Sequence, residues 1–349
     1  MNTETPLVDP DLVAAVRQLF GDKSTPEVVA DAEQNGLPTT LWKQAEELGL
    51  PLVGISEQSG GSGGTLIDAL AILSAAGEFA VPLPLAQTHL AAWLLQSAGL
   101  AVPSGPLTVA PGTKDDTIAL SGSTASGTLH DVPWARGAGS IVALAGSDLV
   151  VIDPADCQIT PGTDLAGMPR DVITFTDAPV TVAPSKVSAD ELFLRGALVT
   201  AAQLAGAMEA ASSITQRYVA ERVQFGKPIG QFQAVQQHVV TLAQMATMTS
   251  LNVVRGGLAA MSRPAAFEIC CLKQVADKNA TLAYRAAHQA HGAIGMTREY
   301  RLQLITRRLL AWRAEFGDEQ QLALRIGAAV SAHGQLAAVI TGGSAEVEV

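Results

Sequence analysis

The chain has 349 residues, of which 48% are hydrophobic and 16% are charged, and its formal net charge is −11. This apolar content excludes a mainly disordered chain, and the acidic balance argues against binding to a nucleic-acid backbone. The three cysteines, two of them adjacent at Cys270 and Cys271, form no disulfide framework. The opening MNTETPLVDPDL lacks the basic and apolar regions of a signal peptide. We therefore expect a folded cytoplasmic protein with a large core and no metal site.

Residues 1–105 have the pattern of a helical domain. Apolar positions recur at helical intervals over 11–20 and 40–48, and Thr65 is a suitable N-cap for a helix over 66–77. The sequence therefore predicts several short helices before the chain changes character.

Two features of this domain resemble functional signals, and we interpret both as structural. The run Gly60–Gly64 precedes a helix but lacks the Lys-Ser/Thr ending of a P-loop, so we interpret it as a plain loop. The stretch 79–113 has no charged residue, yet prolines interrupt it too often for a span of about 20 apolar residues. We expect a buried helix near 85–98.

Residues 106–187 predict a small all-β module. Runs rich in Val, Ile and Thr alternate with Gly, Pro and Asp turns about every ten residues. The runs are TIALSG, SIVALAG, DLVVID, VITFTD and VTVAP.

Residues 188–349 are expected to be helical again. Ser188 and Glu191 fit a capping box at the start of this region. We expect helices over 188–220, 232–262, 264–291 and 299–340, the last with breaks, followed by an acidic tail. The predicted fold class is α+β, with helical, β and helical domains in that order.

The first specific motif is ERVQFGKPIGQFQAVQQ. It places Arg222, Phe225, Gly226 and Gln233 in the spacing R-x-x-F-G-x-x-x-x-x-x-Q. A guanidinium at a helix end can pair bidentately with a diphosphate, and a glutamine can donate to adenine or ribose oxygens. The alternative is that Arg222 only pairs with Glu221 or another nearby carboxylate.

The second motif is HQAHGAIGMTREY. It contains Gln289, Gly292, Gly295, Glu299 and Tyr300 in the spacing Q-x-x-G-x-x-G-x-x-x-E-Y. Glycines allow close approach of a phosphate or ribose to backbone amides. The alternative is that these glycines only shape a turn, and that the neighbouring histidines pack or face solvent.

Together, on this order of domains, the two motifs resemble the acyl-CoA dehydrogenase family, with Ala293 in place of one motif glycine. The resemblance implies an N-terminal helical domain, a middle β domain and a C-terminal four-helix bundle. It also implies FAD as cofactor and α,β-desaturation of an acyl-CoA thioester. In the family these two segments contact the adenine and pyrophosphate half of a neighbouring subunit's FAD. The residues so implied are Arg222, Phe225, Gln233, Gln289, Gly292 and Gly295.

The catalytic base of the family is missing from both places where the resemblance implies it. One place is 17 residues after Glu299, which is Phe316, and the other is 26 residues before Arg222, which is Gly196. The nearest replacements are Glu315 and Glu319. The β module also lacks the family's flavin-covering stretch, and we interpret its Trp134 as a core residue.

The chain thus retains the half-site that serves a neighbour and lacks the half-site that would serve itself. We therefore predict a heteromer, of α2β2 type, with a homologous subunit that holds the base. The resemblance to actinobacterial enzymes that shorten steroid side chains implies a steroid-derived acyl-CoA substrate, with electron-transfer flavoprotein or a similar acceptor. The alternatives are a self-sufficient homo-oligomer using Glu315 or Glu319, a purely structural subunit, and another flavoprotein of this fold, such as a hydroxylase.

Overall fold

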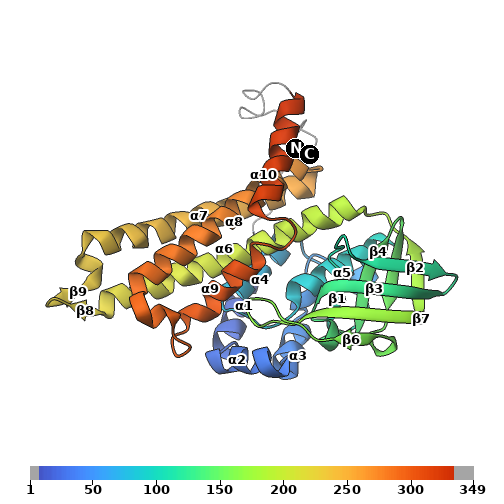
Figure 1. Cartoon of the computed structure of the whole chain (residues 1–349), viewed down its shortest axis with the longest axis horizontal. Helices are drawn as coiled ribbons and strands as arrows, with labels where there is room; N and C mark the ends of the chain where they lie inside the picture. Colours follow the sequence, from blue (N-terminus) through green and yellow to red (C-terminus); the bar gives the residue numbers. More distant parts are fainter. Residues whose placement is uncertain (1–7, 334–349) are drawn as a thin grey trace. The chain divides into compact units, whose positions relative to one another are not determined.

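The structure is a computed structural model that describes residues 8–333 (Figure 1). It divides into two compact units. The first unit takes in the chain up to Ile72 together with Pro82–Gly196, and the second unit takes in Leu73–Val81 and the chain from Ala197. Across the described residues, no helix combines the length and the apolar character needed to cross a membrane.

The N-terminal helices begin at capping signals that are local in sequence. Asp9 and Thr25 each accept a backbone hydrogen bond from the helix that follows, and a proline occupies the first turn of both helices. Thr65 and Asp68 cap the fourth helix reciprocally, as expected for Thr65. These helices are α1 (Pro10–Lys23), α2 (Pro26–Asn35), α3 (Thr39–Glu47) and α4 (Leu66–Glu78). The hydrophobic spacing did not predict α2, because in this ten-residue helix Val29 and Ala32 are the buried residues.

The uncharged stretch after α4 contains a buried helix, as predicted. This helix, α5 (Leu85–Ser97), is buried on nearly every side, and it packs on strands β1 and β4 of the first unit. A helix with buried residues on nearly every side belongs to the core.

The β module is one sheet with strand order β1-β4-β5-β7-β3-β2, with β6 beside β7. Its strands are antiparallel except for the β1–β4 pair. The strands are β1 (Leu107–Val109), β2 (Thr117–Ser121), β3 (Thr124–Pro133), β4 (Ser140–Ala145), β5 (Asp148–Ile152), β6 (Gln158–Thr160) and β7 (Arg170–Pro184).

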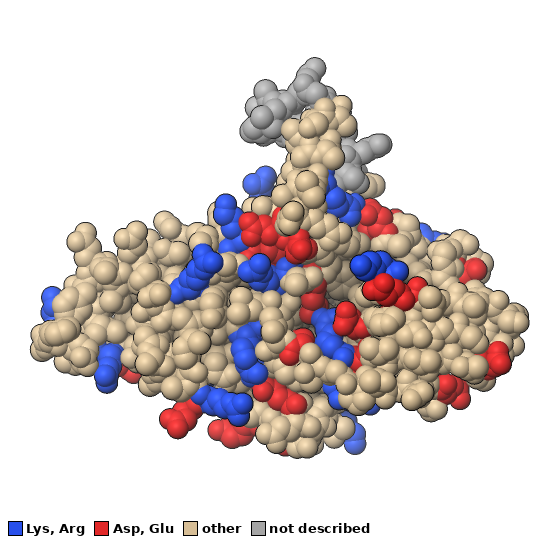
Figure 2. All heavy atoms as spheres, viewed as in Figure 1, with Lys and Arg blue, Asp and Glu red and all other residues tan. Residues whose placement is uncertain are grey.

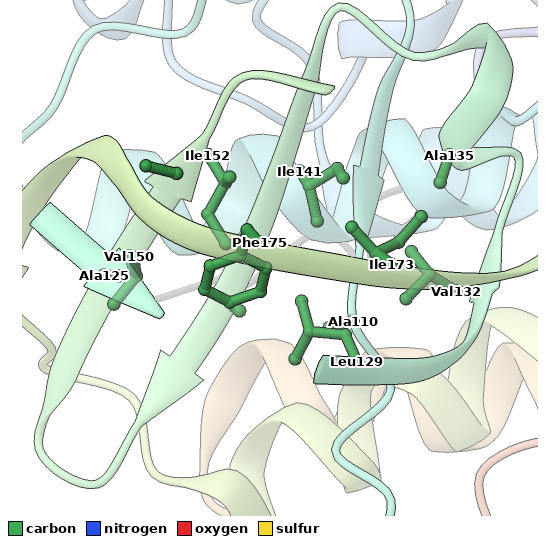
Figure 3. Close-up of a cluster of buried hydrophobic side chains, with 12 residues drawn as sticks. Ala110, Ala125, Leu129, Val132, Ala135, Ile141, Val150, Ile152, Ile173 and Phe175 are labelled. Carbon is green, nitrogen blue, oxygen red and sulfur yellow. The ribbon is translucent and has the colours of Figure 1, made fainter. Parts of the chain in front are cut away.

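The two longest strands of the sheet, β7 and β3, differ from the sequence prediction. The runs VITFTD and VTVAP belong to one strand, β7, because the backbone at Asp177 bends with a φ of 48° without reversing the chain. Strand β7 pairs with β3 as far as Pro179 and with β5 from Val180 onward. Strand β3 has no long apolar run, yet its Leu129 packs with Ile173 and Phe175 in the core of the sheet (Figure 3).

The second unit is helical and begins within a long helix. Ser188 and Glu191 form the predicted capping box, since Glu191 Oε2 accepts from Ser188 Oγ at 2.9 Å and Ser188 Oγ accepts from the Glu191 N–H at 3.2 Å. The elements are α6 (Ala189–Glu221), β8 (Val223–Gln224), β9 (Lys227–Pro228), α7 (Gln233–Ser262), α8 (Ala266–His291), α9 (Leu302–Trp312) and α10 (Glu319–His333). The predicted acidic tail lies outside the described residues.

Two glycines allow the end of α4 to approach α6 closely within the second unit. A Cβ atom on Gly206 would lie 1.7 Å from the carbonyl oxygen of Ser74, and one on Gly77 would lie 2.0 Å from the carbonyl oxygen of Gln203. No side chain fits at either position, so the two backbones are in direct contact.

The charged side chains are interspersed on the face shown in Figure 2, with large uncharged areas between them. This distribution agrees with the low content of charged residues. No continuous basic surface appears on this face for a phosphate backbone.

Candidate functional site

The first motif forms a tight hairpin between α6 and α7. Strands β8 and β9 pair through Gln224 and Lys227, and the two residues between them, Phe225 and Gly226, have φ values of 53° and 79°. Two positive φ angles define a type I′ hairpin turn. A bulky residue seldom adopts this conformation, and the side chain of Phe225 is 92% exposed. The turn therefore holds an aromatic ring out in solvent.

This exposed ring is part of a small aromatic and cationic surface. The rings of Phe225 and Phe232 meet edge to face with their centroids 6.0 Å apart. The Lys227 ammonium lies 4.5 Å from the centroid of the Phe232 ring. An apolar flat surface beside a positive charge suits a ligand that carries both an aromatic ring and phosphate.

Arg222 lies at the base of the hairpin with its side chain exposed. Its backbone N–H donates to the Tyr218 carbonyl at 2.8 Å, and its carbonyl accepts from the Ile229 N–H at 2.8 Å. Among residues 8–333 its guanidinium has no ion pair or hydrogen bond, so the pairing with Glu221 is not formed. The guanidinium is available for an external anion.

Gln233 is the first residue of α7, and its side chain is exposed. The N-cap residue Phe232 makes no side-chain hydrogen bond to the helix. A helix start without a cap leaves backbone N–H donors and the positive end of the helix dipole open to an anion.

The second motif follows the end of α8. Gly292 has φ 65° and ψ −145°, a conformation that requires glycine, and a Cβ there would meet nothing within 4 Å. Gly295 is buried instead, and its Cβ would lie 3.0 Å from the Cβ of His291 and 3.2 Å from Nδ1 of His288. Gly292 therefore provides the open turn, Gly295 provides close packing, and the exposed Gln289 lies just before them.

An aromatic cluster joins the two motifs within the second unit. Tyr218 on α6 stacks on His291 with centroids 4.4 Å apart, and its hydroxyl donates to the His291 carbonyl at 3.4 Å. Tyr300 meets the rings of Tyr218 and His291 at 5.8 Å and 5.1 Å. This cluster brings together segments that are far apart in the sequence. The sequence analysis missed Tyr218, whose one signal was its place one helical turn before Arg222.

Burial controls the protonation of this cluster. It lowers the pKa of His291, and it lowers the pKa of His288, where the neighbouring His291 adds to the effect. Burial also raises the pKa of Tyr300. His288, His291 and Tyr300 are therefore uncharged at neutral pH, and the exposed Arg222 and Lys227 give the hairpin its positive charge.

The place expected for a catalytic base is a turn between α9 and α10. Phe316 and Gly317 have φ values of 50° and 92° there, and Phe316 is half-buried. Glu319 begins α10, where the helix dipole stabilises a carboxylate, and Glu315 is partly buried in the turn. Gly196 is buried on α6. The structure thus retains the turn around residue 316 without a carboxylate at that position.

The sequence matches known proteins over both helical regions. Residues 10–101 match the N-terminal domain of acyl-CoA dehydrogenases, and residues 187–331 match the C-terminal domain. The chain is 30% identical to the acyl-CoA dehydrogenase IpdE2 of Mycolicibacterium smegmatis over 297 residues, which is 84% of this chain and 89% of that protein. The chain belongs to the acyl-CoA dehydrogenase family. This is an oxidoreductase family that acts on acyl-CoA.

Solved structures share its fold over nearly the whole chain. The Tcur3481-Tcur3483 steroid ACAD G363A variant has a TM-score of 0.83 at 23% identity, covering 93% of this chain and 97% of that chain. The ChsE4-ChsE5 complex from Mycobacterium tuberculosis has a TM-score of 0.82 at 18% identity, covering 95% and 99%. At these identities the likeness establishes the acyl-CoA dehydrogenase fold.

Proposed function

We propose that this chain is a subunit of an FAD-dependent acyl-CoA dehydrogenase heteromer. Its role is to contribute contacts to the adenine and pyrophosphate half of an FAD held by a homologous partner subunit. The observation that carries the proposal is the exposed Arg222, which has no ion pair in the described part of the chain, beside the uncapped start of α7. An exposed arginine without a binding partner contributes little to the stability of the fold, so stability does not account for this placement.

The residues of the two motifs fit this part of FAD. The Arg222 guanidinium and the free N–H groups at the start of α7 match a diphosphate. The exposed ring of Phe225 offers a stacking face to an aromatic base, and Gln233 and Gln289 offer amide donors and acceptors for ribose or adenine. When bound, FAD supplies the redox chemistry, and the residues of this chain orient it.

The catalytic base comes from the partner subunit in this proposal. Neither Phe316 nor Gly196 can remove a proton, and no carboxylate replaces them at those positions. A chain with an outward-facing cofactor surface and no base at either expected position is completed by a homologous subunit that has one.

The names of the related proteins support a heteromer and a bulky substrate. One structural neighbour is a steroid ACAD, and another is a complex of two named chains, ChsE4 and ChsE5. We infer a steroid-derived acyl-CoA as substrate and an electron-transfer flavoprotein or a similar protein as electron acceptor.

The test is the flavin content of the chain alone and after co-expression with a homologous dehydrogenase subunit. We expect a colourless chain alone and a yellow complex. Arg222→Met should weaken FAD binding by the complex about 10- to 100-fold, the value of a charge-assisted hydrogen bond. Arg285→Met, which removes an exposed arginine from α8, is the matched control and should bind FAD normally.

Three results would contradict the proposal. Stoichiometric FAD in the chain alone would favour a self-sufficient enzyme, and Glu315→Gln and Glu319→Gln would then be tested for loss of turnover. Full FAD content in the Arg222→Met complex would favour a purely structural subunit. Oxygen-dependent substrate hydroxylation by the complex would favour another flavoprotein activity of this fold.

A further inference from the structure

Arg195, at the N-terminal end of α6, contacts two residues of α5 inside the first unit. Its Nη2 lies 3.3 Å from Nε2 of His89, and its guanidinium carbon lies 5.2 Å from the centroid of the Trp93 ring. His89 and Trp93 are four residues apart on α5 and therefore share one face of that helix. His89 is 2% exposed, while Trp93 and Arg195 keep a partly accessible edge.

The hydrogen bond to Arg195 fixes the proton position on His89. Arginine is always a donor, so Nε2 of His89 accepts, and the proton of the neutral ring is on Nδ1. Burial and the positive charge of Arg195 lower the pKa of His89 to about 3, against a smaller opposing effect of the Val53 backbone. Burial lowers the pKa of Arg195 to about 10, so it stays charged at neutral pH. The pair therefore carries one net positive charge.

One buried N–H donor of this pair has no acceptor, because Nε of Arg195 has no hydrogen-bond partner in the part of the chain that the structure describes. The neutral ring of His89 lies between Arg195 and the Val53 backbone. No carboxylate pairs with Arg195 there either. The buried Asp68 is already engaged by the N–H and hydroxyl of Thr65 at the start of α4.

Another arginine of the first unit, Arg136, shows how a partly buried guanidinium is usually neutralised by a carboxylate. Arg136 lies 3.3 Å from a carboxylate oxygen of the fully buried Asp171 and also donates to the carbonyl of Gly162. A largely buried guanidinium that faces a neutral imidazole and an indole lacks this compensation. Burying a guanidinium without a counterion is unfavourable for folding. Its presence is explained if a ligand supplies the missing negative charge.

We propose that Arg195 and His89 form a binding site for a carboxylate on an otherwise apolar small molecule. The positive charge and the free Nε–H of Arg195 match one carboxylate group, since a guanidinium binds carboxylates through parallel N–H bonds. The indole of Trp93, which keeps a partly accessible edge, matches an apolar body. This site is in the first unit and is independent of the proposed flavin contacts.

The binding test uses the intrinsic fluorescence of the full chain, with Trp93→Phe to identify the signal. Hexanoate should change the Trp93 signal saturably, whereas hexanamide at the same concentrations should not. Arg195→Met should weaken hexanoate binding at least tenfold, and Lys43→Met, an exposed cation on α3, should leave it unchanged. The same hexanoate response in Arg195→Met and in the native chain, or no response in either, would overturn the proposal.

A second pair of probes identifies where the carboxylate comes from. If it belongs to the acyl group of a thioester, adipoyl-CoA should bind at least tenfold more tightly than hexanoyl-CoA, and Arg195→Met should abolish that difference. If hexanoate binds and the two thioesters bind equally, the ligand is a free acid. Both results support the site.

Thermal stability separates a binding role from a structural one. Without ligand, Arg195→Met should leave the melting temperature unchanged or raise it by about 2 °C, because it removes an uncompensated charge. A clear decrease would mean that the guanidinium stabilises the fold, and it would overturn the proposal. Flavin content should be unaffected by Arg195→Met, so failure of this site and failure of the flavin contacts are distinguishable.

Discussion

The ion pair between Lys273 and Asp277 on α8 gives the sharpest stability prediction. Both side chains are fully buried, and the Lys273 ammonium donates to the two Asp277 oxygens at 2.6 and 2.8 Å. Its third donor reaches the carbonyl of Gly317 at 3.0 Å, in the turn where related enzymes are expected to carry the base. Burial lowers the pKa of Lys273 and raises the pKa of Asp277, and each charge opposes the shift of the other. The pair therefore connects α8 to the α9–α10 turn.

The magnitude follows from what each substitution leaves behind. Asp277→Leu leaves a buried ammonium without its counterion, and Lys273→Met leaves a buried carboxylate, so each should lower the free energy of unfolding by about 3–5 kcal/mol. The double variant fills the same space with apolar atoms and leaves the Gly317 carbonyl unpaired, which costs about 1–3 kcal/mol. The double variant should thus be more stable than either single variant, although the two single effects add to about 6–10 kcal/mol.

The assay is urea unfolding followed by far-UV circular dichroism on all four members of this double-mutant cycle. Lys278→Met, which removes an exposed lysine from the same helix, is the control and should change stability by less than about 0.5 kcal/mol. Additive single effects, or single effects below 1 kcal/mol, would refute the reasoning that these two charges compensate each other in a dry environment.

Three further predictions concern backbone packing and protonation. Gly206→Ala should lower the free energy of unfolding by about 3 kcal/mol or more, because its Cβ would overlap the Ser74 carbonyl. Urea unfolding measures this loss. A near-neutral result would contradict the close contact between α4 and α6. Gly292→Ala should lower the free energy of unfolding by about 1–3 kcal/mol, because alanine is strained in the backbone conformation of Gly292. Gly327→Ala, with open space on α10, should be neutral or should stabilise the fold by up to about 1 kcal/mol. Equal effects of the two variants on urea unfolding would refute the backbone argument. His89 has a pKa of about 3 in the folded chain, below its value of about 6.5 when unfolded, so the unfolded chain takes up the proton first. Its contribution to stability is complete above pH 6.5 and is lost by about 1.4 kcal/mol per pH unit as the pH falls from 6.5 towards 3. His89→Gln should make the urea midpoint less dependent on pH between pH 7 and pH 5. The same pH dependence in His89→Gln and in the native chain would contradict a buried neutral imidazole.

The sequence by itself determined the elements whose signals are local. The capping box of Ser188 and Glu191 starts α6 where the residues predict it, and the proline-flanked apolar stretch forms the buried α5. These predictions succeed because a cap needs a partner only three residues away, and because an uncharged stretch of helical length between prolines is visible in the composition alone. The two family motifs could likewise be read as strings, with Ala293 as the one substitution, so the family could be inferred before any contact was known.

The local sequence pattern did not predict the strands whose conformation depends on pairing between distant segments. The two runs predicted as separate strands are one strand, β7, because it pairs with β3 as far as Pro179 and with β5 from Val180 onward. Strand β3 carries too few apolar residues to be predicted alone, and sheet contacts supply the burial of Leu129.

The contacts that give this protein its candidate chemistry depend on the tertiary structure. Tyr218 and His291 are 73 residues apart, and His89 and Arg195 are 106 apart, so no local pattern connects them. Burial then determines their charge, because the pKa of a histidine depends on the solvent that folding removes and on the cation that folding places beside it. The sequence specified which side chains are present, and the packing of distant helices decided which of them are left without partners and thus free to bind a ligand.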